Sequence, residues 1–150
     1  MRRSKLSSDD GSSSLEFIVA GLILLVPLVY LILTMSAIQG GALAVEGASR
    51  QAARVFVQSD NESDAAAAAQ RAIALALADY GLRSRDASVT ITCDPDPDVC
   101  LTPRGFVTVR VSTTVPLPLL PPALTFDAPV GAPLDSVATE QVSRFAEAPE

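Results

Sequence analysis

The sequence predicts an α+β protein: a long N-terminal transmembrane helix that extends outward, a second helix and a small antiparallel sheet. Three observations lead to this prediction. A run without any charge extends from Phe17 to Ile38, an alanine-rich segment with helical periodicity follows it, and later segments alternate apolar and polar residues with a period of two. We expect a cytoplasmic leader over residues 1–11, a transmembrane helix over 12–38 and an extracytoplasmic α+β domain over 39–150.

The charge-free run has the length of a membrane span. As a helix, its roughly 22 residues extend about 33 Å, which is close to the thickness of the hydrocarbon core of a bilayer. A buried core helix of this kind would need a larger domain around it than the rest of the 150-residue chain can build. Ser12 and Ser14 are suitable N-terminal caps, and the kink expected at Pro27 is tolerated in membrane helices.

The charges around the run predict its orientation. Arg2, Arg3 and Lys5 precede it, and acidic residues are frequent in the region after it. Because basic flanks stay in the cytoplasm, we expect a single-pass protein of the cell membrane with a cytoplasmic N-terminus and its C-terminal domain outside. Membrane lipid is therefore an expected partner of this protein.

Helical periodicity continues beyond Ile38 to about Gln58, with Gly40-Gly41 as a flexible point. The expected buried stripe consists of Val45, Ala48, Ala52, Val55 and Phe56. Ser59 and Glu62 have the S-x-x-E spacing of a capping box, which marks a break and a new helix that ends at Gly81. The buried stripe of this second helix is expected to consist of Ala69, Ile73, Ala76, Leu77 and Tyr80.

Two alternating runs follow, and a turn region connects them into an antiparallel hairpin. Their apolar positions are Val89, Ile91 and Cys93 in the first run, and Val107, Val109 and Val111 in the second. The segment Val115–Pro122 is too rich in proline for a central strand, and it either covers the hairpin irregularly or docks a partner. Asp135–Phe145 is compatible with a third strand or a short helix.

Composition excludes several classes of function. Asp and Glu outnumber Lys and Arg by 17 to 11, and the formal net charge is −6, which argues against nucleic acid as the main partner. The chain has no His, which removes Ser-His-Asp and Cys-His catalysis and most zinc sites. We therefore expect no enzyme, no catalytic residues and no cofactor.

Cys93 and Cys100 are expected to form a disulfide, because both lie in a turn region outside the cytoplasm, where disulfides persist. The loop between them contains Asp94, Asp96 and Asp98, which alternate like calcium ligands. Prolines replace the flexible linkers of such a site, and the Gly and bidentate Glu of the EF-hand spacing are missing. We expect an acidic, solvated loop without metal, with calcium binding as the alternative.

The junction between leader and apolar run contains the most informative residues. Gly11 is followed five positions later by Glu16, and Phe17 then opens the apolar run. A carboxylate at the edge of hydrocarbon is costly unless it is paired, and it is therefore usually functional. The competing interpretation is that Glu16 lies in the headgroup region, where the dipole of the helix N-terminus favours a negative charge.

This junction resembles the G-x-x-x-x-E-[FY] processing site of type IV pilin-like proteins, especially Flp pilins and the TadE/TadF pseudopilins. The resemblance implies that a membrane-embedded prepilin peptidase cleaves between Gly11 and Ser12. It also implies that Glu16 and Phe17 take part in assembly, with Glu16 meeting the new α-amino group of a neighbouring subunit. A rival site, Ala42–Ala44, has the A-x-A form cleaved by signal peptidase, which would release a soluble domain.

The rest of the chain is more similar to TadE-like proteins than to the much shorter Flp pilins. Those proteins have an outer domain of this size, with alanine-rich helical sequence and then a V-x-V-x-V run such as Val107–Val111. The resemblance implies a minor pseudopilin that assembles, initiates or caps a Tad (Flp-type) pilus or a related secretion apparatus. Its partners would be the peptidase, other pilins and pseudopilins, and pilus assembly proteins. The alternative is a non-polymerising, membrane-anchored envelope protein that binds a partner.

Processing is directly testable. N-terminal sequencing of protein extracted from membranes should begin Ser12-Ser13-Ser14-Leu15. Gly11→Ala should slow the cleavage only partly, because alanine is also small, whereas Gly11→Leu should block it. An intact Met1 in cells that contain the peptidase would contradict the pseudopilin interpretation, and a start near Leu43 would support signal peptidase cleavage.

Overall fold

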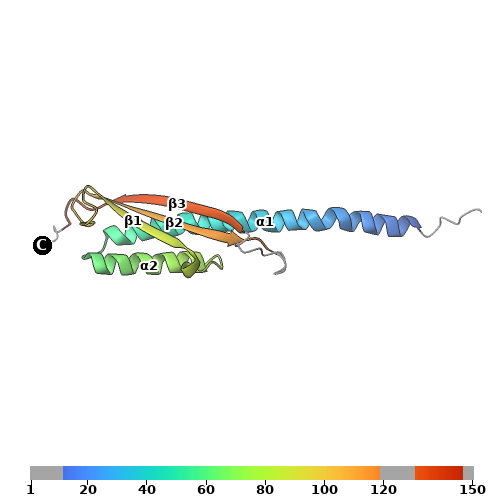
Figure 1. Ribbon diagram of the computed structural model, residues 1–150, viewed down its shortest axis with the longest axis horizontal. Coiled ribbons are helices and arrows are strands. Elements are labelled where there is room, and N and C mark those ends of the chain that lie inside the picture. Colours follow the sequence, from blue (N-terminus) through green and yellow to red (C-terminus); the bar gives the residue numbers. More distant parts are fainter. Residues whose placement is uncertain (1–11, 119–130, 147–150) are drawn as a thin grey trace, which may run out of the picture.

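The computed structural model describes residues 12–118 and 131–146 and confirms the α+β class (Figure 1). A long helix lies along one face of a three-stranded antiparallel sheet, and a second helix packs beside the first. The elements are α1 (Ser12–Val57), α2 (Glu62–Ala78), the short 3-10 helix η1 (Ser84–Asp86), β1 (Ser88–Asp94), β2 (Phe106–Pro116) and β3 (Gly131–Gln141). The strand order is β1-β2-β3, so β2 is central.

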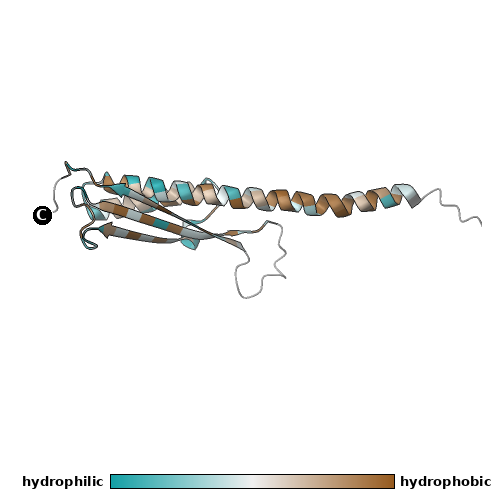
Figure 2. Ribbon diagram, turned by 90° about the horizontal axis from the view of Figure 1, so that it is seen from above, coloured by the Kyte–Doolittle hydropathy of each residue, from teal (hydrophilic) through white to brown (hydrophobic). Residues whose placement is uncertain are grey.

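Helix α1 is a single helix of 46 residues that contains Pro27. Its first part projects beyond the sheet and is almost uniformly apolar (Figure 2). None of its most apolar 18-residue window is buried inside the protein. Among the residues that the structure describes, α1 is the one helix that is long and apolar enough to cross a membrane.

The second part of α1 forms the core of what we call the α+β domain, together with α2 and the sheet. The predicted stripe is buried at Val45, Ala48, Ala52 and Phe56, and Val55 is half-buried. Ser49 is also fully buried, and its hydroxyl is 3.1 Å from the hydroxyl of Ser136 on β3. Glu46 and Arg50 form an ion pair on the exposed side of the helix.

The two glycines at the boundary of these parts are packing positions, and the predicted flexible point is wrong. The helix continues through Gly40 and Gly41 without a break. A Cβ atom added to Gly41 would lie 2.3 Å from Val115 Cγ2 and 3.0 Å from Leu134 Cδ1. One added to Gly40 would lie 3.4 Å from Tyr80 Cδ1. The missing side chains therefore let the sheet and the end of α2 approach α1 closely.

The N-terminus of α2 is capped by Asn61, so the predicted capping box is wrong. The Asp64 N–H donates to Asn61 Oδ1 at 2.9 Å, which satisfies one of the free amides of the first turn. Ser59 instead donates its hydroxyl to the Val55 carbonyl at the end of α1 (3.0 Å). Glu62 is the first residue of α2, and its carboxylate accepts a hydrogen bond from the Cys100 N–H.

Helix α2 ends at Ala78, and the turn that terminates it contains the predicted Gly81, whose φ is +72°. The Leu82 N–H bonds to the Leu77 carbonyl and the Gly81 N–H to the Ala78 carbonyl, both at 2.9 Å, which is the pattern of a Schellman cap. The buried stripe consists of Ala65, Ala69, Ile73 and Leu77. Tyr80 was predicted to be buried but is 49% exposed, because it follows the turn out of the helix.

The predicted hairpin is confirmed. Val89, Ile91 and Cys93 of β1 face Val111, Val109 and Val107 of β2. The three β2 valines are fully buried against the helices. The opposite face of the sheet is polar, with Ser88–Ser112 and Thr108–Thr139 hydroxyl pairs (both 2.8 Å) and an Arg110–Asp135 ion pair (2.9 Å).

The region of Asp135–Phe145 contains a strand and no helix, since β3 covers Gly131–Gln141. Its Pro133 is tolerated because β3 is an edge strand. Central strand β2 continues through Val115 to Pro116, so the sequence prediction placed its end too early. Pro116 is the last residue of β2, where a missing N–H disturbs the ladder least. The remainder of the proline-rich segment, residues 119–122, lies outside the described residues.

The glycine contacts predict opposite effects for two alanine substitutions. Gly41→Ala should lower the free energy of unfolding by about 1–3 kcal/mol, because the added methyl overlaps Val115 and Leu134. Gly47→Ala is the matched control: Gly47 lies in the same helix with nothing within 4 Å of an added Cβ. That change should stabilise the protein by about 0.5–1 kcal/mol. Denaturant unfolding in detergent, followed by circular dichroism, measures both, and stabilisation by both substitutions would contradict the close approach.

Candidate processing and assembly site

The start of α1 brings three of the predicted site residues together. Ser12 is the first residue of the helix, Glu16 lies four positions later on the same face, and Phe17 follows. At helical rise the Ser12 and Glu16 positions are about 6 Å apart along the axis. Gly11, the residue before the predicted cleavage point, lies outside the described residues.

The surroundings of Glu16 leave its carboxylate open. Its side chain is exposed, and the flanking Leu15 and Phe17 are 65% and 80% exposed. None of the described basic side chains forms an ion pair with it. The dipole at the start of a helix favours a negative charge at this position. A cation supplied by another molecule would add the pairing that the described part of this chain lacks.

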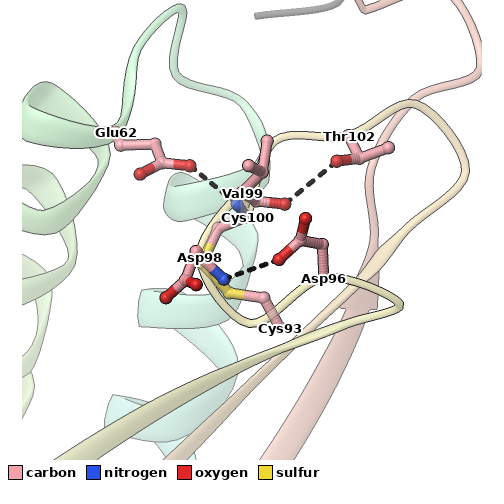
Figure 3. The surroundings of a disulfide bond; sticks show 7 residues. All are labelled: Glu62, Cys93, Asp96, Asp98, Val99, Cys100 and Thr102. Carbon is pink, nitrogen blue, oxygen red and sulfur yellow. Dashed lines mark hydrogen bonds between the residues drawn. A yellow bond between two sulfur atoms is a disulfide. The ribbon is translucent and has the colours of Figure 1, made fainter.

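The predicted disulfide is present at the opposite end of the molecule (Figure 3). Cys93 lies near the end of β1, and its Cα is 5.0 Å from that of Cys100. This separation is within the usual range for a disulfide. The bond closes the first part of the connection between β1 and β2, and Cys93 lies in the hydrophobic core.

Glu62 has a role in this loop that the sequence analysis missed. Its Oε1 accepts a hydrogen bond of 2.7 Å from the Cys100 N–H, which attaches the loop to the start of α2 (Figure 3). The S-x-x-E spacing pointed to this residue but suggested a partner within its own helix turn. The actual partner is 38 positions away in the chain, and only the folded arrangement reveals it.

Asp96 stabilises a local turn in the acidic loop. Asp96 Oδ1 accepts a hydrogen bond from the Asp98 N–H at 3.0 Å, and its carbonyl accepts one from the Val99 N–H at 3.4 Å. Within residues 12–118 and 131–146, no group of three or more His, Cys, Asp or Glu side chains is arranged to hold a metal ion. The absence of a metal in the protein stays a prediction.

A hollow of about 550 Å³ lies next to this loop, between the end of α1 and the residues that follow β3. Its lining consists of Val57, Gln58, Ser59, Asp60, Leu101, Val142, Ser143, Phe145 and Ala146. Asp60 is the one ionisable side chain among them, whereas general acid–base chemistry with carboxylates usually requires two. The hollow therefore offers no support for an enzyme, and the absence of catalysis stays a prediction.

Comparison of the chain with known proteins found no match among family models, curated proteins or solved structures. The functional argument therefore depends on the residues and geometry described above.

The disulfide predicts a measurable contribution to stability. The Cys93→Ser/Cys100→Ser double variant should lose about 2.5 kcal/mol of unfolding free energy, the loop-closure value for a cross-link this short. Reduced wild-type protein is the matched control and should unfold at the same denaturant concentration as the variant. Non-reducing mass spectrometry should show a linked peptide pair about 2 Da lighter than the dithiol form. Two alkylatable thiols in freshly isolated protein would contradict the bond.

Proposed function

We propose that this protein is a TadE-like minor pseudopilin that takes part in the assembly, initiation or capping of a Tad (Flp-type) pilus or a related secretion apparatus. The observation that carries the proposal is the unbroken helix α1. One half of it is apolar and is not covered by other parts of the chain, and we call it the bare half. The other half is the core helix of the α+β domain. A subunit of this shape can be held in the membrane and then packed by its bare half against other subunits.

The bare half of α1 supports packing between helices. Its large apolar side chains are exposed along its whole length, from Leu15 at 65% to Met35 at 56%. Such a surface is stable only when lipid or other apolar helices cover it. Within it, Gly21 has nothing within 4 Å of an added Cβ, and glycine at such a position lets a second helix approach closely. Exchange of lipid for neighbouring helices is therefore the natural assembly step.

Glu16 supplies the specificity in this proposal. Apolar contacts between helices allow many relative positions, whereas a charge pair in a low-dielectric environment favours one. Cleavage after Gly11 would create an α-amino group on Ser12. The Glu16 carboxylate of one subunit would pair with this amine on the next subunit and fix the axial offset between their α1 helices.

The sheet edges are less suited to assembly in one membrane. Both β1 and β3 run antiparallel to β2, so the two free edges run in the same direction. Pairing β1 of one copy with β3 of the next would continue the sheet, and each strand adds about 20–25° of twist. Three strands would rotate the next subunit by about 60–75°, so two anchors could share a bilayer only if each tilted by about 30–40°, well above the usual 20° or so. Contacts through α1 are therefore favoured.

In this proposal the chemistry is done to the protein by the prepilin peptidase on the cytoplasmic side. The N-terminus is cytoplasmic, and the α+β domain is on the other side of the membrane. Other pilins, pseudopilins and assembly proteins are its partners. A non-polymerising anchored envelope protein that binds its partner through the outer domain would share the anchor and the domain but would have no need for Glu16.

Glu16→Ala separates these two functions. The substitution should leave membrane insertion unchanged or improved, because removal of a charge makes the segment easier to embed. Cleavage after Gly11 should also continue, if the peptidase recognises mainly the Gly and the apolar run. Crosslinking to pilus components and pilus number should both decrease strongly, since the helix offset is no longer fixed. Glu16→Gln tests whether the charge itself is required.

Glu46→Gln is the matched control. Glu46 lies in the same helix but pairs with Arg50 of its own chain, so crosslinking and pilus number should stay at wild-type values. Normal complexes and normal piliation in both Glu16 variants, at wild-type protein level, would contradict the pseudopilin proposal. The non-polymerising anchor would then be the better description.

A further inference from the structure

The junction between anchor and domain contains no linker. Ile38 ends the apolar run, and Gly41, three residues later, already contacts Val115 of β2 and Leu134 of β3. Three helical residues correspond to about 4.5 Å. If the apolar run spans the bilayer, the end of the sheet therefore lies within a few ångströms of the hydrocarbon boundary.

Because α1 is continuous, this position is fixed. A flexible linker would let the domain tumble away from the membrane, but a continuous helix keeps the domain at one height and close to one tilt. The anchor-side end of the domain is defined by Gly40 and Gly41, Tyr80, and the segment from Leu82 to Asp86. A headgroup layer several ångströms thick would surround this end on all sides that protein does not cover.

Tyr80 lies at the height of this boundary. A Cβ atom added to Gly40 would be 3.4 Å from its ring, and the residue is 49% exposed. Tyrosine is enriched at the interface between membrane and water, because its ring is apolar and its hydroxyl is polar. The turn after α2 leaves the side chain of Tyr80 half-exposed at this height, where it can contact lipid.

Two arginines accompany it. Arg83 and Arg85 have side chains that are 65% and 72% exposed. Both approach the single carboxylate of Asp86, at 2.7 Å and 3.8 Å respectively, so this group of three carries a net positive charge, while Asp79 at the end of α2 adds one carboxylate to the same side of the domain. The Asp86 carbonyl accepts a hydrogen bond from Thr113, two residues before Val115, which keeps the group near the anchor side. Each guanidinium retains free N–H donors for a phosphate oxygen.

The far end of the domain has the opposite character. Val57 ends α1 nineteen residues after Ile38, a distance of about 28 Å along the helix. The carboxylates near this end are those of Asp60, Glu62, Asp64, Asp94, Asp96, Asp98 and Glu140, and they outnumber the arginines there, which are Arg54, Arg104 and Arg144. An anionic membrane surface would repel this end and attract the arginine pair.

We propose that the α+β domain is itself a lipid-binding surface, with Tyr80 in the phospholipid headgroup layer and Arg83 and Arg85 in contact with lipid phosphates. The proposal requires that α1 spans a bilayer but is independent of the pseudopilin function. A subunit with this contact would have to release it when it leaves the membrane for an assembly. The height of the domain over the membrane can be measured in the isolated protein, without any pilus component.

The chain contains no tryptophan, so each introduced tryptophan is a single fluorescent reporter. Tyr80→Trp is the test position. Tyr30→Trp, in the apolar part of α1, is the positive control, and Phe106→Trp, at the far end of β2, is the negative control. Each full-length variant is reconstituted into phosphatidylcholine/phosphatidylglycerol vesicles that contain lipid brominated near the headgroup or, in a parallel sample for Tyr30→Trp, near the ends of the acyl chains. The brominated lipid is in both leaflets, so the direction of insertion does not affect the result.

Tyr80→Trp should lose most of its emission to the brominated lipid and should be blue-shifted, while Phe106→Trp should keep both its intensity and its red emission. Quenching at Tyr30→Trp reports that the anchor is inserted. Quenching at Tyr30 together with an unquenched Tyr80→Trp would overturn the proposal, and it would leave the pseudopilin function untouched. Conversely, normal piliation of Glu16 variants would not affect the lipid contact.

The phosphate contacts have their own test. With the bromine carried only by phosphatidylglycerol, quenching of Tyr80→Trp should exceed the quenching with the bromine carried only by phosphatidylcholine, because the arginines attract anionic headgroups. Arg83→Gln/Arg85→Gln in the Tyr80→Trp protein should remove this difference. Arg104→Gln/Arg144→Gln is the matched control, because these arginines lie at the far end of the sheet, and it should not change the quenching. Equal quenching by brominated phosphatidylglycerol and brominated phosphatidylcholine in the protein that retains Arg83 and Arg85 would overturn the assignment of phosphate contacts to this pair.

Discussion

The continuity of α1 is the constraint on which the rest of the structure depends. A 46-residue helix without a break transmits the position of its apolar half directly to its packed half. Backbone hydrogen bonds hold this helix through Gly40 and Gly41, where propensity alone would favour a bend. The sheet stabilises that stretch, because Val115 and Leu134 occupy the space that a side chain at position 41 would need, and Tyr80 lies against Gly40. Anchor and domain are thus one rigid element.

The small α+β domain obtains its core through close packing against this helix. Its described buried residues are mainly alanine and valine, so the elements must approach closely to exclude water. Alanines on α1 and α2 allow that approach, and β-branched residues on the sheet fill the remaining space. At the far end, where few apolar side chains are available, a disulfide and the Glu62–Cys100 hydrogen bond hold the hairpin connection against α2.

The proposed functional residues and the acidic disulfide loop lie at opposite ends of the molecule. The proposed processing and assembly residues lie at the start of α1, and the acidic disulfide loop lies beyond its other end, about 60 Å from Glu16 at helical rise. Charge is uneven along the same axis, because carboxylates outnumber arginines at the far end, whereas Arg83 and Arg85 lie on the anchor side. With α1 in a bilayer, as proposed, one end of the domain would face the membrane and the other end would point away from it.

The sequence by itself determined what depends on local pattern. Periodicity and the absence of charge predicted both helices, the hairpin and the anchor, and Gly81 and the Cys93–Cys100 pair were found from neighbouring residues alone. The G-x-x-x-x-E-F junction was also found from neighbouring residues alone. The structure adds only that Ser12 and Glu16 share a helix face. The tertiary structure decided the partners of Glu62, the packing role of Gly41, the exposure of Tyr80 and the strand around Asp135. Each of these depends on residues distant in the chain, whose approach costs chain entropy that only the complete set of contacts repays.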